Sequence, residues 1–100
     1  RPAIQPSASS AWHLYVIRIL PEAAVDHSIV FEVLREAGIG VQLHYHPVHL
    51  QPYYREQGFE CGDYPEAECH GNTALSLPLH QSLSEDQQDQ IVGKLRKLLS

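Results

Sequence analysis

The sequence is poor in positive charge. It has 7 lysine and arginine residues against 12 aspartates and glutamates, so its net charge is -5 with the histidines neutral. A module that binds duplex nucleic acid needs clustered lysine and arginine to neutralise phosphates. The basic residues that do cluster, Lys94, Arg96 and Lys97, lie at the end of the last predicted helix. We therefore expect no nucleic acid partner.

Cysteine is scarce, and no long apolar run is present. Cys61 and Cys69 are too few for a disulfide scaffold and do not form a CxxC pair, which indicates a reducing, cytoplasmic setting. The longest apolar stretch, residues 14–20, contains Arg18 and is far shorter than the ~20 residues of a membrane span. The sequence has no starting methionine and no signal-peptide pattern. We expect no membrane association.

Motifs for self-contained catalysis are missing as well. There is no GxSxG elbow for a nucleophilic serine and no glycine-rich phosphate loop. A Schiff-base lysine needs a desolvated pocket, which the end of a surface helix does not offer to Lys94 or Lys97. The acids around Cys61 should raise the pKa of its thiol and weaken it as a nucleophile. The sequence therefore predicts no catalytic residue in this chain.

The composition is that of one globular domain. One hundred residues fit a single domain, and hydrophobic residues make up 43% of the chain against 19% charged. Residues 1–10 contain prolines and serines without periodicity, so we expect a linker or a truncated edge there. The domain itself is predicted over residues 11–100.

Three segments rich in alternating or β-branched residues are predicted strands: 12–20, 41–46 and 74–79. The first is apolar on both faces except at His13 and Arg18, which indicates a central, largely buried strand. The last is expected at an edge of the sheet, because Pro78 cannot donate a backbone hydrogen bond.

Two segments with helical spacing of apolar residues, 26–37 and 84–99, are predicted helices. Residues 52–57 are predicted to form a short helix or a turn, and Pro65 suits the first position of a further helix over residues 65–70. Asp26 is a good N-cap, and Gly38 stands where a left-handed residue is wanted after a helix. Ser84 with Gln87 forms a capping-box pattern. The order of strands and helices predicts an α/β two-layer sandwich with the helices on one face of the sheet.

The histidines at the end of the second predicted strand are the most distinctive chemical feature. Gln42, His44 and His46 should share the side opposite the core, and His49 should return over them after the turn at Pro47. Three imidazoles can bind a metal, relay protons or hold an anionic ligand. A metal-binding module, a non-catalytic interaction surface and a ligand contact all remain open at this point.

Other polar residues have simpler explanations. Arg18 within an apolar strand must find a carboxylate, a carbonyl or a phosphate, and an internal ion pair or a side chain that reaches the surface would satisfy it. Cys69 on a predicted helix is expected to be a small packing residue. Glu66 and Glu68 are explained as charges at the start of a helix.

Five motifs follow one another along the chain: SAWHLYV at 10–16, LREAGI at 34–39, HYxPxH at 44–49, YPxAE at 64–68 and LSLPLH at 75–80. In this order and spacing they resemble the C-terminal part of the DegT/StrS sugar aminotransferase family, from about residue 9 to residue 99. The resemblance implies the small domain of a fold-type I aminotransferase, with a small three-stranded, mainly antiparallel sheet.

The resemblance also implies an activity. Members of this family use pyridoxal phosphate, usually with glutamate as amino donor, to convert a keto group on a nucleotide-linked sugar into an amine. The branch that looks most similar makes UDP-linked 4-amino-4,6-dideoxy-N-acetyl sugars of the pseudaminic acid type. The family's N-terminal large domain carries the Schiff-base lysine and binds the cofactor, and the intact enzyme is a homodimer. This chain alone is expected to bind no cofactor and to be inactive.

The resemblance places His44 and Tyr45 at a strand end that faces the nucleotide-sugar, with His49 as a further substrate-binding candidate. Such groups can donate hydrogen bonds to sugar hydroxyls or diphosphate oxygens, and they discriminate between sugars more than they assist the chemical step. His46 is outside the family pattern, and His13 is a weaker candidate. The apolar surface that a partner domain would cover should make the isolated chain self-associate.

Overall fold

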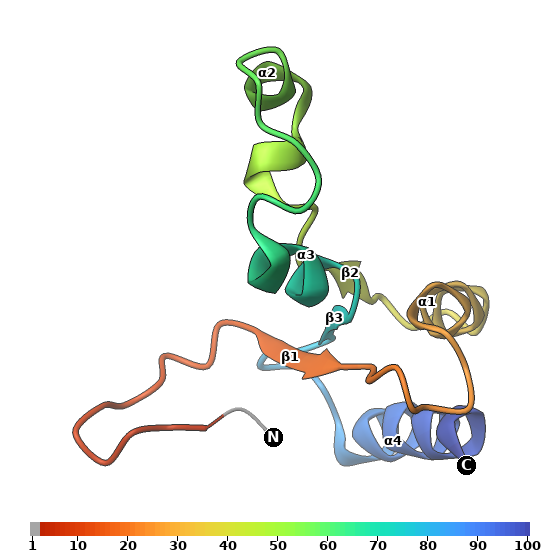
Figure 1. Cartoon of the computed structure of the whole chain (residues 1–100). Coiled ribbons are helices and arrows are strands. Elements are labelled where there is room, and N and C mark those ends of the chain that lie inside the picture. Colours follow the sequence, from red (N-terminus) through yellow and green to blue (C-terminus); the bar gives the residue numbers. More distant parts are fainter. Residues whose placement is uncertain (1–2) are drawn as a thin grey trace.

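The computed structural model describes residues 3–100 (Figure 1). Its elements are β1 (Tyr15–Arg18), α1 (His27–Glu36), β2 (Gln42–Leu43), the 3-10 turn η1 (Val48–Leu50), α2 (Pro52–Arg55), α3 (Pro65–Gly71), β3 (Ala74–Leu77) and α4 (Glu85–Leu99). Residues 3–14 are exposed and contain no helix or strand, and residues 1–2 of the predicted linker lie outside the described residues. Within the described chain, every helix is too short or too polar to cross a membrane.

β3 is the central strand of the sheet. The strand order is β1–β3–β2, and both outer strands pair with β3 in antiparallel direction. The expected order, with the first strand in the centre and residues 74–79 at an edge, is wrong. Pro78 lies beyond the end of β3 and interrupts no sheet hydrogen bond, while Ala74, Leu75 and Ser76 are all buried.

β1 is a short edge strand. Its first three residues are half-buried, and Arg18 is exposed. Trp12 and Leu14, which lengthen the apolar run in the sequence, precede the strand and are 53% and 41% exposed. The apolar run in the sequence is therefore longer than the strand, and its length did not indicate a central position in the sheet.

Leu75 of β3 anchors the core between the sheet and two helices. It pairs with Ile17 of β1 and Leu43 of β2, so these three side chains lie on one face of the sheet. α1 contacts both α4 and β3. The buried core residues are Ile19, Val30, Leu34, Val41, Leu75, Ile91 and Leu95. The predicted sandwich of helices on a small three-stranded antiparallel sheet is confirmed.

Two helix ends are where local sequence signals predict them. In α4 the Ser84 hydroxyl accepts from the Gln87 N–H, and the Gln87 side chain accepts from the Ser84 N–H, which completes the capping box. Gly38 follows α1 with a φ of +77°, a left-handed conformation that favours glycine. Asp26 is the N-cap of α1, although its side chain accepts no capping hydrogen bond.

Residues 47–71 form a projection that extends away from the sheet, with α2 at its far end and α3 near the sheet (Figure 1). The projection begins and ends at one narrow neck. A Cβ built on Gly71 would lie 2.8 Å from the backbone oxygen of Tyr45 and 2.9 Å from the Cδ of Pro47. Glycine is required at position 71 because the two segments of the chain approach each other so closely there that a side chain would not fit.

Replacing Leu34 by alanine should destabilise the chain by about 2–5 kcal/mol, because this side chain is fully buried in the core and its truncation leaves a cavity. The matched control is Ile29→Ala on the same helix, where the side chain is 47% exposed. The control should lose less than about 1 kcal/mol. Urea unfolding followed by circular dichroism measures both losses. Equal losses would contradict the assignment of Leu34 to the core.

Candidate functional site

His44 and Tyr45 directly follow β2 at the neck of the projection. β2 contains only Gln42 and Leu43, so the strand expected over residues 41–46 ends before both candidates. His44 is half-buried, and Tyr45 is 64% exposed. The two side chains therefore stand where the sheet ends and the projection begins.

The central strand holds His44. Ser76 of β3 is 3% exposed, and its Oγ lies 2.7 Å from the Nδ1 of His44. Gln42 pairs with Ser76, and His44 comes two residues after Gln42, so both lie on the face opposite Leu75. This confirms the expected placement of Gln42 and His44 away from the core.

His49 lies inside the projection. It is 7% exposed, and its Nε2 lies 2.8 Å from the Oε1 of Glu68. Its ring packs edge-on against Tyr64, with the ring centroids 4.9 Å apart. Pro47 leads into η1, whose turn directs His49 toward α3. The polar contact of this imidazole is thus made within the chain.

The histidines do not gather into a metal site. His46 is exposed, with its Nε2 3.4 Å from the backbone oxygen of Leu50, and His13 is exposed in the segment before β1. Across residues 3–100, no three histidine, cysteine, aspartate or glutamate side chains come together as possible metal ligands. The geometry gives no support to a metal-binding module built on His44, His46 and His49.

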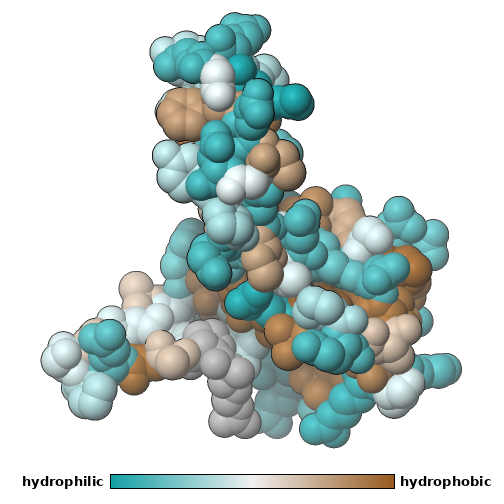
Figure 2. Space-filling model, viewed as in Figure 1, coloured by the Kyte–Doolittle hydropathy of each residue, from teal (hydrophilic) through white to brown (hydrophobic). Residues whose placement is uncertain are grey.

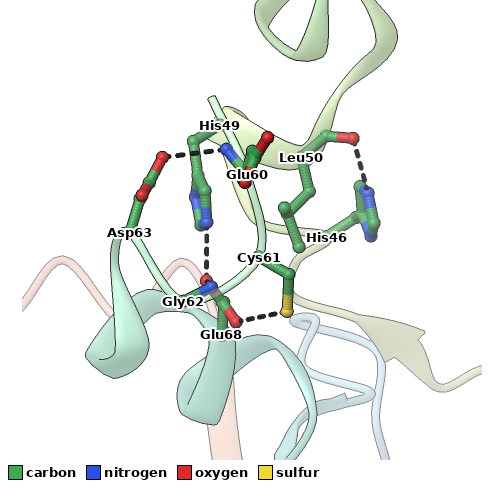
Figure 3. Close-up of polar contacts among 8 residues, drawn as sticks. All are labelled: His46, His49, Leu50, Glu60, Cys61, Gly62, Asp63 and Glu68. Carbon is green, nitrogen blue, oxygen red and sulfur yellow. Dashed lines mark hydrogen bonds and ion pairs between the residues drawn. The ribbon is translucent and has the colours of Figure 1, made fainter. Parts of the chain in front are cut away.

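Glu68 is the centre of a polar network in the projection (Figure 3). Its Oε1 accepts hydrogen bonds from the Gly62 N–H at 2.7 Å and from His49 at 2.8 Å, and its Oε2 accepts one from the Cys61 thiol at 3.1 Å. One carboxylate therefore ties α3 to η1 and to the loop before α3. The sequence explained Glu68 only as a charge at a helix start, and its place in the YPxAE motif was the one signal of a further role.

These donors stabilise the charged form of Glu68. The hydrogen bond from Cys61, then those from Gly62 and His49, lower the pKa of the Glu68 carboxyl from 4.5 to about 2. The same hydrogen bond, together with the negative charge of Glu68, raises the pKa of the Cys61 thiol. The expectation that nearby acids weaken Cys61 as a nucleophile is confirmed, because the thiolate is the reactive form.

Arg18 has partners that the sequence did not indicate. Its Nε donates to the Oγ1 of Thr73 at 2.9 Å, and its Nη2 donates to the Sγ of Cys69 at 3.2 Å. Within residues 3–100, Arg18 forms no ion pair, so the first of the two expected explanations is wrong. The second is confirmed, because Arg18 is exposed and its side chain reaches the surface. Cys69 is exposed on α3, so its interpretation as a packing residue is wrong. These contacts tie α3 to β1.

Large apolar side chains are exposed at many points of the surface. Figure 2 shows hydrophobic surface gathered mainly over the body that contains the sheet, α1 and α4, while the far end of the projection is mostly hydrophilic. An apolar cavity of about 280 Å³ also opens between the end of β3 and α4, where Leu77, Pro78 and Ile91 are among its lining residues. Exposed apolar side chains that gather into one patch are typical of a surface that packs against another.

Comparison with known proteins identifies the family. Residues 1–96 match the DegT/DnrJ/EryC1/StrS aminotransferase family, and the chain belongs to this family. The spore coat polysaccharide biosynthesis protein SpsC of Bacillus subtilis (strain 168) is 36% identical over 101 residues, which cover 98% of this chain and 26% of SpsC.

Two solved structures share the fold closely. DesV of S. venezuelae superposes with a TM-score of 0.83 at 29% identity, over 96% of this chain and 25% of DesV. Spr1654 of Streptococcus pneumoniae, solved in its PLP form, superposes with a TM-score of 0.75 at 30% identity, over 88% of this chain and 24% of Spr1654. The chain thus spans about a quarter of the length of the relatives it matches.

The residues of this chain do not fit pyridoxal phosphate, the cofactor of this aminotransferase family. Its two lysines lie on α4, where Lys97 is exposed and Lys94 is half-buried. Neither is among the residues that line the apolar cavity beside α4 or the two other pockets described, and Lys97 is exposed, so neither amine is seen in a desolvated pocket suited to a Schiff base. We therefore derive no catalytic step from this chain.

The pKa of Glu68 predicts how the projection responds to acid. Because the folded-state pKa of about 2 is below the usual 4.5, the network is fully stabilising above about pH 4.5 and weakens as the pH falls from there toward 2. The Gly62 amide resonance should report the titration by NMR with a midpoint near 2, and Glu68→Gln should abolish it. Glu66→Gln, an exposed change on the same helix, is the control. A Gly62 midpoint near 4.5 would contradict the network.

Glu68→Gln should also make Cys61 react faster with a thiol reagent at neutral pH, because the change removes the charge that raises its pKa. Each unit by which a thiol pKa falls raises the rate about threefold, after the loss of intrinsic nucleophilicity is counted. The rate is measured in a Cys69→Ser background, because Cys69 is also free and exposed. Glu66→Gln again serves as the control, and an unchanged Cys61 rate in Glu68→Gln argues against the hydrogen bond.

Proposed function

We propose that residues 11–100 are the C-terminal small domain of an enzyme that uses pyridoxal phosphate and glutamate to aminate a nucleotide-linked keto-sugar. Three findings support this proposal. The chain belongs to an aminotransferase family, it spans about a quarter of the length of its relatives, and it has no lysine suited to the cofactor. The cofactor would supply the amino-transfer chemistry from a large domain, and this chain would help to bind and orient the sugar nucleotide.

The observation that carries the proposal is the pair of polar rings at the end of β2. His44 has one nitrogen bonded to Ser76, and its other nitrogen, Nε2, has no hydrogen-bond partner among residues 3–100. No side-chain nitrogen or oxygen of those residues is both fully buried and without a partner, so this nitrogen is not fully buried. Tyr45, the next residue in the chain, is 64% exposed. Both groups can donate hydrogen bonds to hydroxyl or diphosphate oxygens.

His49 takes a different part in the proposed site. Its ring is 7% exposed and bonded to Glu68, which leaves it little surface for a ligand. We assign it an indirect effect on substrate binding, in which it fixes the projection that begins just after Tyr45. The Glu68 network would then determine how firmly the neck is held.

The proposal extends to partners and location. The apolar surface of the body would meet the enzyme's own large domain, and the intact enzyme would be a homodimer. Within the family we favour the branch that makes UDP-linked 4-amino-4,6-dideoxy-N-acetyl sugars, on the motif resemblance given above. A reducing, cytoplasmic setting agrees with the two cysteines, which are both free.

The test uses the complete gene product that contains this sequence. With pyridoxal phosphate it should turn yellow and aminate a UDP-linked keto-sugar in the presence of glutamate. His44→Ala and Tyr45→Phe should each raise the KM for the sugar nucleotide about tenfold with little change in kcat, because each removes a hydrogen bond made equally in the ground and transition states.

His46→Ala is the matched control, since His46 is exposed between the same two elements and has only a long contact to a backbone oxygen. It should leave KM unchanged. No amination by the wild-type enzyme with any UDP-keto-sugar would overturn the proposed activity. An active enzyme whose KM does not respond to His44→Ala or Tyr45→Phe would instead overturn the assignment of the binding residues.

A further inference from the structure

Ser76 is a buried polar residue on the most constrained strand of the fold. It is 3% exposed, and β3 is held on both sides, by Val16 of β1 and by Gln42 of β2 at its own position. Its hydroxyl makes one side-chain hydrogen bond, the 2.7 Å contact to the Nδ1 of His44. Packing of the hydrophobic core does not explain this serine, because Leu75 next to it faces the core and Ser76 faces away.

The hydrogen-bond requirements of the two groups fix the proton on the imidazole. A buried hydroxyl that donates to nothing leaves an unsatisfied O–H, which is costly. Among residues 3–100 the acceptor within reach of the Ser76 hydroxyl is the Nδ1 of His44. If Ser76 donates, Nδ1 carries no proton, and the proton of the neutral imidazole must be on Nε2.

We propose that Ser76 is a positioning residue that fixes His44 in the Nε2–H tautomer and directs this N–H toward an oxygen acceptor of the substrate. The inference rests on the proposed function for the identity of the substrate, but not for the tautomer. His44 then acts as a hydrogen-bond donor while neutral. The groups that it selects are acceptors such as sugar hydroxyl or diphosphate oxygens.

The position of β2 explains why a serine on β3 can control this ring. β2 ends at Leu43, so no sheet pairing holds the backbone of His44. The hydrogen bond to Ser76 returns the ring to the sheet and restricts its rotation. An ordered donor loses less entropy when it binds a ligand, which improves affinity without a new contact.

The tautomer can be measured directly in the complete gene product labelled with nitrogen-15 at its histidines. Nitrogen-15 NMR at pH 8.5, where histidines are mostly neutral, should show His44 with a protonated Nε2 and an unprotonated Nδ1. In Ser76→Ala the ring should change to a mixture of tautomers, and in Ser76→Thr, which keeps the hydroxyl, it should remain in the wild-type form. A wild-type His44 protonated on Nδ1 overturns the proposal without any variant.

The functional consequence is measured in the complete enzyme. Ser76→Ala should raise the KM for the sugar nucleotide about fivefold with kcat nearly unchanged, and Ser76→Thr should restore it to within about twofold of wild type. Ser82→Ala, at an exposed serine in the turn before α4, is the control for a general loss of stability. In Ser76→Ala, wild-type KM or unchanged His44 tautomer populations would overturn the positioning role.

The two measurements separate this inference from the proposed function. If the enzyme proves not to aminate sugar nucleotides while NMR shows the Nε2–H tautomer, the proposed function fails and the role of Ser76 at His44 stands. If the enzyme is active but His44 is protonated on Nδ1, the role of Ser76 fails and the proposed function stands. Thermal unfolding of Ser76→Ala, Ser76→Thr and Ser82→Ala checks that the compared variants are folded.

Discussion

The pairing of β3 with strands on both sides is the constraint that joins the core to the proposed site. Two neighbouring residues of β3 face in opposite directions: Leu75 is fully buried with the core, and Ser76 holds His44 on the other face. Neither side chain can shift far while β1 and β2 remain paired with the strand. The hydrophobic contacts that stabilise one face therefore also fix the hydrogen bond on the other, and the orientation of His44 depends on the stability of the whole sheet.

The projection is held by a different kind of interaction. Few of its residues are buried, and its ends meet at the neck between Pro47 and Gly71. Glu68 joins its segments, because one carboxylate accepts hydrogen bonds from His49 in η1 and from Cys61 and Gly62 in the loop before α3. Aromatic rings, including Phe59 and Tyr64, pack together beside this network. Hydrogen bonds to a charged group are stronger than neutral ones but depend on its ionisation, so the projection is more sensitive to acid than the apolar body. Tyr45 lies between these two regions.

Local signals predicted the parts of the fold that local interactions decide. The capping box at Ser84 and the glycine after α1 need only neighbours in the chain, and the sequence identified both. The strand order depends on contacts between distant segments, and neither the apolar run before β1 nor Pro78 after β3 contained that information. The partners of Glu68 were beyond prediction for the same reason, since helical position explains a glutamate in a first turn equally well.

The same limit applies to the two histidines of the HYxPxH motif, both of which the resemblance offers as substrate-binding candidates and which the structure places in different surroundings. Glu68 is ionised and can only accept, so His49 must donate its Nε2 proton to the interior of the projection. Ser76 can donate, so His44 can receive a hydrogen bond on Nδ1 and keep a proton on Nε2, which is not fully buried. The difference between the two imidazoles thus arises from the partner, a carboxylate in one case and a hydroxyl in the other. Only a buried donor leaves the outer N–H of a neutral imidazole available to a ligand.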